Sequence, residues 1–135
     1  MIHIVIDGYP VPAARPRFAR TARGVRTYNP AKVMQYRERL QAAASEQMQG
    51  KPLMEGPLAM TVICVMPFTA GMSKKLRNRA MMAPLPHTKK PDSDNLLKNF
   101  CDALKGIIFR DDAQLWCIDI RKFYGNKPRV EIWVE

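Results

Sequence analysis

The sequence predicts an α+β domain in which helices flank a central mixed β-sheet. Two segments, residues 30–48 and 94–105, carry apolar residues at helical spacing. Four other segments are rich in β-branched residues or alternate with period two: residues 2–6, 57–66, 113–124 and 129–135. At 135 residues, with no internal repeat and no linker-like stretch, the chain is expected to form a single domain over 1–135.

The first half of the chain predicts a strand, a basic loop and a long helix. Residues 2–6, IHIVI, alternate as a strand and lead into a turn region. Residues 13–28 carry five arginines and contain Pro16 and Gly24, so a basic loop is expected there. Asn29 followed by Pro30 predicts a capped helix start, and the helix should run to about Met48. Its buried stripe should be Val33, Tyr36, Leu40, Ala43 and Ala44.

The second half predicts three more strands and two helices. Residues 57–66 form an apolar, β-rich run that is typical of a mostly buried strand. A short helix is expected from Ser73 to about Met81, inside a Pro-rich basic stretch. Residues 94–105 predict a clear amphipathic helix that ends at Gly106. Residues 113–124 and 129–135 alternate on either side of Gly125, which predicts a C-terminal hairpin.

The composition indicates a partner of opposite charge. The formal net charge is +10 and the pI is near 9.9, which favours nucleic acid first and an anionic membrane surface second. No stretch approaches the roughly 18 apolar residues that a membrane span needs, and the first residues lack a signal-peptide pattern. Three cysteines without a C-x-x-C pair predict reduced, mostly buried thiols in a cytoplasmic protein.

Five aspartates are concentrated in residues 89–114 of this basic chain: Asp92, Asp94, Asp102, Asp111 and Asp112. Crowded carboxylates raise one another's pKa unless something positive compensates them. Asp92 and Asp94 can face one point because alternate residues of an extended segment point the same way. Carboxylate oxygens suit Mg²⁺, and the following helix start would favour an anionic group beside it. The pattern therefore predicts a metal site, although Asp94 capping the helix and pairing with Lys98 is the simpler alternative.

The sequence does not determine how close Asp112 lies to Asp94. The intervening helix would carry the chain about 18 Å away. Residues 106–110, if extended, would span about 16 Å and bring Asp112 back. Alternatively, Asp112 meets Asp94 of a second subunit. Asp102 is expected to be a surface residue or a contact that positions the helix.

Residues 89–115, KKPDSDNLLKNFCDALKGIIFRDDAQL, closely resemble the signature of the RusA-type Holliday junction resolvases, endonucleases common in phages and prophages. The segments GYPVPAARPRF and YNPAKVMQYRERL near the N-terminus are also similar to that family's opening. The resemblance implies a RusA-like mixed-sheet fold and an intertwined homodimer. It also implies a Mg²⁺-dependent endonuclease, with Mn²⁺ as an alternative cation, that resolves four-way DNA junctions by paired nicking.

The resemblance also implies a role for individual residues. It makes Asp92, Asp94 and Asp112 metal-binding and catalytic, Lys98 catalytic, and Asp111 an auxiliary metal-binding position. Basic side chains are expected to contact DNA phosphates; they are Arg15, Arg17, Arg20, Arg23, Arg26, Lys74, Lys75, Lys89 and Lys90. Two alternatives are a DNA-binding protein without activity and a metal-dependent nuclease for other branched DNA or RNA.

Overall fold

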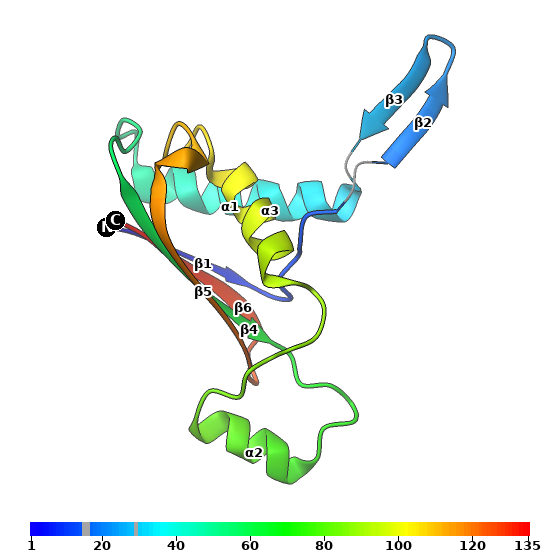
Figure 1. Ribbon diagram of the computed structural model, residues 1–135, viewed down its shortest axis with the longest axis vertical. Helices are drawn as coiled ribbons and strands as arrows, with labels where there is room; N and C mark the ends of the chain where they lie inside the picture. The colour runs from blue at the N-terminus through cyan, green and yellow to red at the C-terminus, as the bar shows by residue number, and fades with distance from the viewer. Residues whose placement is uncertain (15–16, 29) are drawn as a thin grey trace.

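A four-stranded mixed sheet with two helices packed on one face forms the body of the protein (Figure 1). The computed structural model describes residues 1–14, 17–28 and 30–135. The sheet order is β1-β6-β4-β5, and α1 and α3 lie side by side across it. The bounds are β1 Ile2–Asp7, α1 Ala31–Met48, β4 Leu58–Met66, α3 Ser93–Leu104, β5 Leu115–Tyr124 and β6 Arg129–Val134. The expected α+β class is confirmed.

The core lies between the sheet and the two helices. Ile2, Ile4 and Ile6 of β1 are all buried, as are the alternate residues Val130, Ile132 and Val134 of β6. Because β1 and β6 are antiparallel neighbours, these side chains share one face. That face meets the buried stripes of the helices, which are Val33, Tyr36, Leu40, Ala44 and Met48 of α1 and Leu96, Phe100, Ala103 and Leu104 of α3.

The stripe and end of the first predicted helix are confirmed, with Ala43 only partly buried. Its predicted cap, Asn29, lies outside the described residues, and Pro30 immediately precedes the helix.

The predicted C-terminal hairpin is wrong, because β5 and β6 are not neighbours. β4 lies between them and pairs parallel with β5 and antiparallel with β6. The physical reason is burial: β4 contains the most apolar run of the sheet, including Val62, Cys64 and Met66 at 0% exposure. A strand of this kind is stabilised most at the centre of a sheet. β4 therefore takes the central position, and β6 pairs with the side of β4 that faces away from β5.

The predicted basic loop over residues 13–28 is also wrong. It contains a two-stranded hairpin, β2 Arg17–Thr21 and β3 Gly24–Tyr28, which projects from the body (Figure 1). The turn places Gly24 at φ +122°, where a side chain would be strained. Thr21 Oγ1 donates to the Gly24 carbonyl at 3.1 Å and supports the turn. The many arginines of this segment obscure its period-two alternation, so the sequence did not predict the two strands.

The second projection is α2, Lys74–Met82, at the opposite end of the molecule (Figure 1). Its predicted cap is confirmed, since Ser73 Oγ accepts from Leu76 N at 3.1 Å. Only Ala80 of this helix is buried, whereas Met81 and Met82 are exposed. None of the helices in the described ranges offers a long enough apolar stretch to cross a bilayer.

The cysteines are free thiols, as expected, but they differ in burial. Cys64 and Cys101 are buried, whereas Cys117 is exposed on β5. Burial raises the pKa of both buried thiols to about 12, so they remain protonated. They therefore behave as core residues.

Candidate active site

Two of the predicted metal ligands lie at the start of α3. Asp92 immediately precedes the helix and Asp94 is in its first turn. The simpler alternative, in which Asp94 caps the helix, does not hold, because Asp92 occupies the cap position. Its side chain makes no capping hydrogen bond and instead accepts from Lys90 Nζ at 3.0 Å. In the described residues Asp94 therefore remains available beside the free N–H groups of a helix start, which favour anionic groups, whereas Asp92 lies in an exposed ion pair with Lys90 that a bound cation would have to displace.

Lys98 follows Asp94 by one helical turn, and both side chains are exposed. Within the described residues, neither Asp94 nor Lys98 takes part in an ion pair. The simpler alternative, a mutual Asp94–Lys98 pair, is therefore not what this structure contains. An exposed ammonium one turn after Asp94 is free to meet a phosphate oxygen.

A lysine from β5 holds the segment that carries Asp92. Lys122 Nζ donates to the carbonyls of Lys89 at 2.8 Å and Pro91 at 2.7 Å. The preceding residues also follow β5, since His87 N donates to the Lys122 carbonyl at 3.0 Å. Sequence reasoning missed Lys122, because nothing in the alternation of β5 distinguishes it from a solvent-facing lysine. The fold thus ties the aspartate-bearing loop to the sheet.

A buried asparagine holds the N-terminal segment beside α3. Asn99 of α3 is fully buried, and its Nδ2 donates to the Val11 carbonyl at 2.9 Å. Arg37 Nε donates to Asn99 Oδ1 at 2.6 Å, which satisfies the remaining polar atom. These bonds fix the N-terminal segment along α3. A hollow of ≈ 300 Å³ results beside the aspartates, lined by Tyr9, Pro12, Lys90, Pro91, Asp92 and Asn95.

Asp111 and Asp112 lie at the other end of α3, before β5. Asp111 caps the 3₁₀ helix Asp112–Gln114, accepting from Ala113 N at 3.0 Å, and Gln114 Oε1 accepts from Asp111 N at 3.2 Å. The Ala113 N–H bond lowers the pKa of Asp111. Hydrogen bonding to Asp111 raises the pKa of the neighbouring Asp112. Asp111 therefore has a structural role in the turn, whereas Asp112 is exposed.

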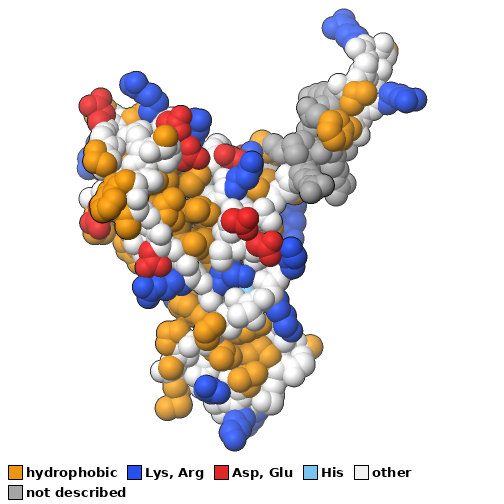
Figure 2. Space-filling view, viewed as in Figure 1, with side chains coloured by type: hydrophobic (Ala, Val, Ile, Leu, Met, Phe, Trp, Pro, Cys, Tyr) orange, Lys and Arg blue, Asp and Glu red, His pale blue; other side chains and the backbone are white. Residues whose placement is uncertain are grey.

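The two aspartate pairs are far apart in one chain. Residues 105–109 form a tight turn, with Gly106 N donating to the Phe109 carbonyl at 2.7 Å, so the extended return to Asp94 does not occur. The 12 residues of α3 separate the pairs by about 18 Å. β5 supports this distance, since Leu115 to Lys122 spans about 23 Å of strand. In Figure 2, acidic side chains likewise gather at separate places, with hydrophobic and uncharged surface between them.

Asp92 and Asp94 suit a hard cation, but they are only two donors, both from the start of α3. Within the described residues, no three His, Cys, Asp or Glu side chains lie close enough to hold one metal ion. Asp92 and Asp94 provide the carboxylate oxygens that Mg²⁺ prefers, and this ion is commonly held by one or two protein carboxylates. Asp102 is outside this group, because Arg37 Nη2 lies 3.2 Å from its Oδ2 and the pair joins α1 to α3. Its expected role as a helix-positioning contact is confirmed.

The basic residues expected to bind DNA are distributed over several elements. Arg20 and Arg23 lie on the hairpin, Lys74 and Lys75 begin α2, and Lys89 and Lys90 precede α3. All six of these side chains are exposed. Arg15 lies outside the described residues, and for Arg17 and Arg26 only the backbone is described. A DNA molecule that contacts the two projections must therefore extend along the long axis of the protein (Figure 1).

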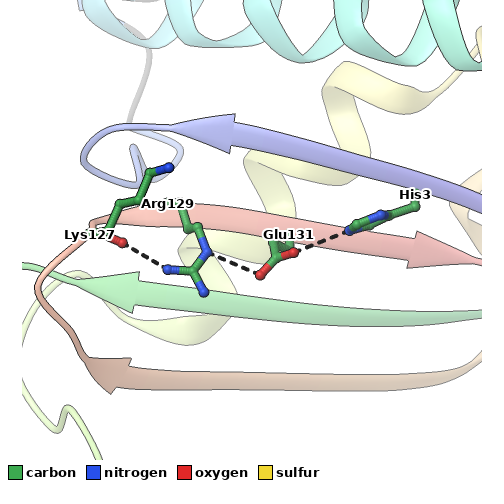
Figure 3. Close-up of polar contacts among 4 residues, drawn as sticks. All are labelled: His3, Lys127, Arg129 and Glu131. Atoms are coloured by element: carbon green, nitrogen blue, oxygen red, sulfur yellow. Dashed lines mark hydrogen bonds and ion pairs between the residues drawn. The ribbon is translucent and has the colours of Figure 1, made fainter. Parts of the chain in front are cut away.

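The histidines do not belong to this site. His87 is buried, and its ring centroid lies 4.9 Å from that of Tyr124, so it is not a phosphate contact. His3 is a strand residue on the sheet face away from the helices, as expected. Its Nε2 lies 3.3 Å from Glu131 Oε1, while Arg129 Nε donates to the other Glu131 oxygen at 3.1 Å (Figure 3). These contacts occupy Glu131, which is therefore a poor candidate for a metal ligand.

Comparison with known proteins identifies the family to which this chain belongs. The profile of the family described as "Endodeoxyribonuclease RusA" matches residues 7–135, nearly the whole chain. The chain belongs to the RusA family. A protein of Bacillus subtilis (strain 168), "Uncharacterized protein YqaN", is 34% identical over 135 residues, which cover 98% of this chain and 94% of that protein. As a RusA-family member, the chain is an endodeoxyribonuclease of the Holliday junction resolvase class. The resemblance read from residues 89–115 is thus confirmed.

Proposed function

We propose that this RusA-family chain resolves four-way DNA junctions by Mg²⁺-dependent paired nicking, as a homodimer. The observation that carries the proposal is the start of α3, where Asp92 and Asp94 lie together with Lys98 one turn later. The family match supports endonuclease activity. The net charge of +10 supports binding of a large polyanion.

The residues at the start of α3 divide the chemistry between them. Asp92 and Asp94 hold the cation, with Mn²⁺ as an alternative to Mg²⁺. A bound divalent cation supplies Lewis-acid polarisation of the phosphodiester and charge neutralisation. Lys98 stabilises the negative charge that develops on the phosphate oxygens during cleavage. Lys89 and Lys90, both exposed on the adjoining loop, orient the strand by contacting neighbouring phosphates.

We infer that the metal site is completed by Asp112 of a second subunit. The separation of about 18 Å along α3 prevents one cation from contacting Asp94 and Asp112 of the same chain. A two-fold axis through the middle of the α3–β5 layer would place the start of one α3 beside the end of the other. Each dimer then has two equivalent sites, one for each of two opposing DNA strands.

Exposed apolar side chains near Asp112 support this arrangement. Trp116 is 74% exposed and Ile118 is 41% exposed, both on the edge strand β5. Trp116 also lines a shallow groove formed by residues 52–57 and 110–116. Exposed aromatic side chains at a sheet edge are typical of a protein interface. A second subunit that covers Trp116 would bring its own residues next to Asp112.

The proposal is tested with a labelled synthetic four-way junction and a linear duplex of the same sequence. Wild-type protein with Mg²⁺ is expected to nick two opposing junction strands and to leave the duplex intact. Asp94→Asn should reduce cleavage at least about 100-fold while junction binding persists, because one cation ligand is lost. Asp119→Asn is the matched control, since Asp119 pairs with Arg121 on β5 and should leave cleavage unchanged.

Three results would contradict the proposal. Salt-sensitive junction binding without cleavage in Mg²⁺ or Mn²⁺ would indicate a DNA-binding protein without activity. Cleavage that survives Asp94→Asn would remove the assigned site. Preferential cleavage of a flap or of RNA would indicate a different substrate for the same residues.

A further inference from the structure

The β2–β3 hairpin presents two apolar side chains on one face of an isolated ribbon. Phe18 and Arg20 are two residues apart on β2, and Arg20 is directly opposite Val25 on β3. Their side chains therefore point to the same face of the ribbon. Phe18 is 73% exposed and Val25 is 67% exposed.

No side chain in the described part of the chain covers Phe18 or Val25. The hairpin projects away from the sheet and helices, so its apolar face does not pack on the core (Figure 1). A two-stranded hairpin is only marginally stable by itself in water. Exposed Phe and Val on such an arm therefore indicate a surface that is covered when a partner binds.

The charge around these two residues identifies the class of partner. Residues 17–28 contain four arginines, at positions 17, 20, 23 and 26, and no aspartate or glutamate. The surface that accepts this arm must be anionic where it meets the arginines. Nucleic acid offers both phosphates for arginine and flat apolar bases for an aromatic ring. The combination therefore fits DNA better than protein.

We propose that the hairpin is a base-contacting arm in which Phe18 stacks on an unstacked base at the branch point of the junction. Val25 lies beside Phe18 and widens the apolar face, while Arg20 and Arg23 contact the flanking phosphates. This inference rests on the proposed function for the identity of the DNA. It adds a source of structural selectivity that lies outside the aspartate site.

Selectivity follows from the cost of opening the base stack. Inserting an apolar side chain into a continuous duplex requires that two stacked base pairs be separated. At a branch point the stacking is already interrupted, so the same contact forms without that cost. Phe18 should therefore strengthen binding to a junction and contribute little on linear duplex.

The test is a comparison of binding affinities without Mg²⁺, so that no strand is cut. Phe18→Ala is expected to weaken junction binding on the order of tenfold, the usual loss for one base-stacking aromatic. Its duplex affinity should stay within about twofold of wild type, since stacked bases are not accessible to the ring. Phe18→Trp should restore junction binding, and Val25→Ala should weaken it in the same direction.

Two matched controls separate the apolar contact from other effects. Arg23→Ala should weaken junction and duplex binding alike and reduce the salt dependence of both, as expected of a phosphate contact. Met82→Ala removes an exposed apolar side chain from α2, at the far end of the molecule, and should leave the junction preference intact. In addition, 2-aminopurine at the branch point should change its fluorescence on binding wild type but not Phe18→Ala.

Two outcomes would overturn the inference. Equal losses of affinity for the junction and for the duplex would show that Phe18 makes no contact specific to the branch point. A change in the self-association constant of Phe18→Ala, measured by sedimentation equilibrium without DNA, would show that a second subunit covers the hairpin. Failure of the proposed function is distinguishable, since a protein that never cuts can still bind junctions through Phe18.

Discussion

Single side chains decide how the aspartate loop is presented. Lys122 is the clearest case, because its Nζ donates to two loop carbonyls, those of Lys89 and Pro91, at 2.8 and 2.7 Å. Both carbonyls lie within three residues of Asp92. The lysine therefore acts by holding the loop that places Asp92 beside Asp94.

Replacing Lys122 tests this positioning role. Lys122→Met should raise the Mg²⁺ concentration for half-maximal junction cleavage about tenfold, as loss of an outer contact commonly does. Lys122→Arg, which keeps the donors, should restore part of the affinity. Lys127→Met, an exposed lysine of the β5–β6 connection, is the control. An unchanged Mg²⁺ requirement in Lys122→Met would show that the loop holds its shape without this contact.

At the scale of single residues, His87 leads to a second prediction, which concerns how stability depends on pH. Burial, and then the nearby charge of Lys122, hold the pKa of His87 below its ordinary value of 6.5. Below that pH the unfolded chain takes up a proton that the folded chain does not. The contribution of neutral His87 to stability is therefore complete above pH 6.5 and is lost as the pH falls below it.

Urea unfolding of wild type and His87→Phe between pH 7.5 and 5 measures this effect. The wild-type free energy of unfolding should fall more steeply, by at most about 1.4 kcal/mol per pH unit from this group. The variant keeps an aromatic ring against Tyr124 but does not titrate. Parallel pH curves for the two proteins would show that His87 takes up its proton equally in the folded chain.

At the scale of elements, the edge strand β5 carries the expected subunit contact. Trp116→Ala should shift the protein from dimer towards monomer, because an aromatic side chain near the centre of an interface commonly contributes 2 kcal/mol or more, about 30-fold in the dissociation constant. Sedimentation equilibrium measures this constant directly. Met82→Ala, which removes a side chain of comparable exposure from α2, is the control. A dimer of undiminished stability in Trp116→Ala would place the interface elsewhere.

The elements also show what a sequence can predict. Both long helices and the strands β1 and β4 were predictable, since their apolar residues recur with a clear period. Pairing was not, because β5 and β6 alternate equally well as hairpin partners or as neighbours of a common strand. The outcome depends on which strand is most completely buried, and that strand is β4.

At the scale of the whole molecule, local sequence is enough to propose the residues of the site, but it does not determine where Asp112 lies relative to them. One short segment at the start of α3 carries Asp92, Asp94 and Lys98, so local helix geometry is enough to bring them together. The position of Asp112 depends on the turn at 105–109, whose hydrogen bonds keep it at the far end of α3. No local pattern distinguishes that turn from an extended return.

The whole molecule also separates its charges. The basic hairpin and α2 project from opposite ends, and the aspartates lie on the body between them (Figure 1). This arrangement fits a substrate that is held at several points and cut at the centre. On the proposed function it also accounts for exposed carboxylates in a basic protein, since a cation held there would make that region complementary to phosphate.

Mixing two inactive variants, Asp94→Asn and Asp112→Asn, tests the central claim most directly. In a shared site, each mixed dimer keeps one complete site, made from the unchanged Asp94 of one subunit and the unchanged Asp112 of the other. Each variant alone should fail to cut a four-way junction in Mg²⁺, and co-expressed mixtures should recover about a quarter of wild-type sites, nicking one strand per mixed dimer. A mixture that stays inactive while wild type cuts would contradict the account, because every site would then lie within one chain.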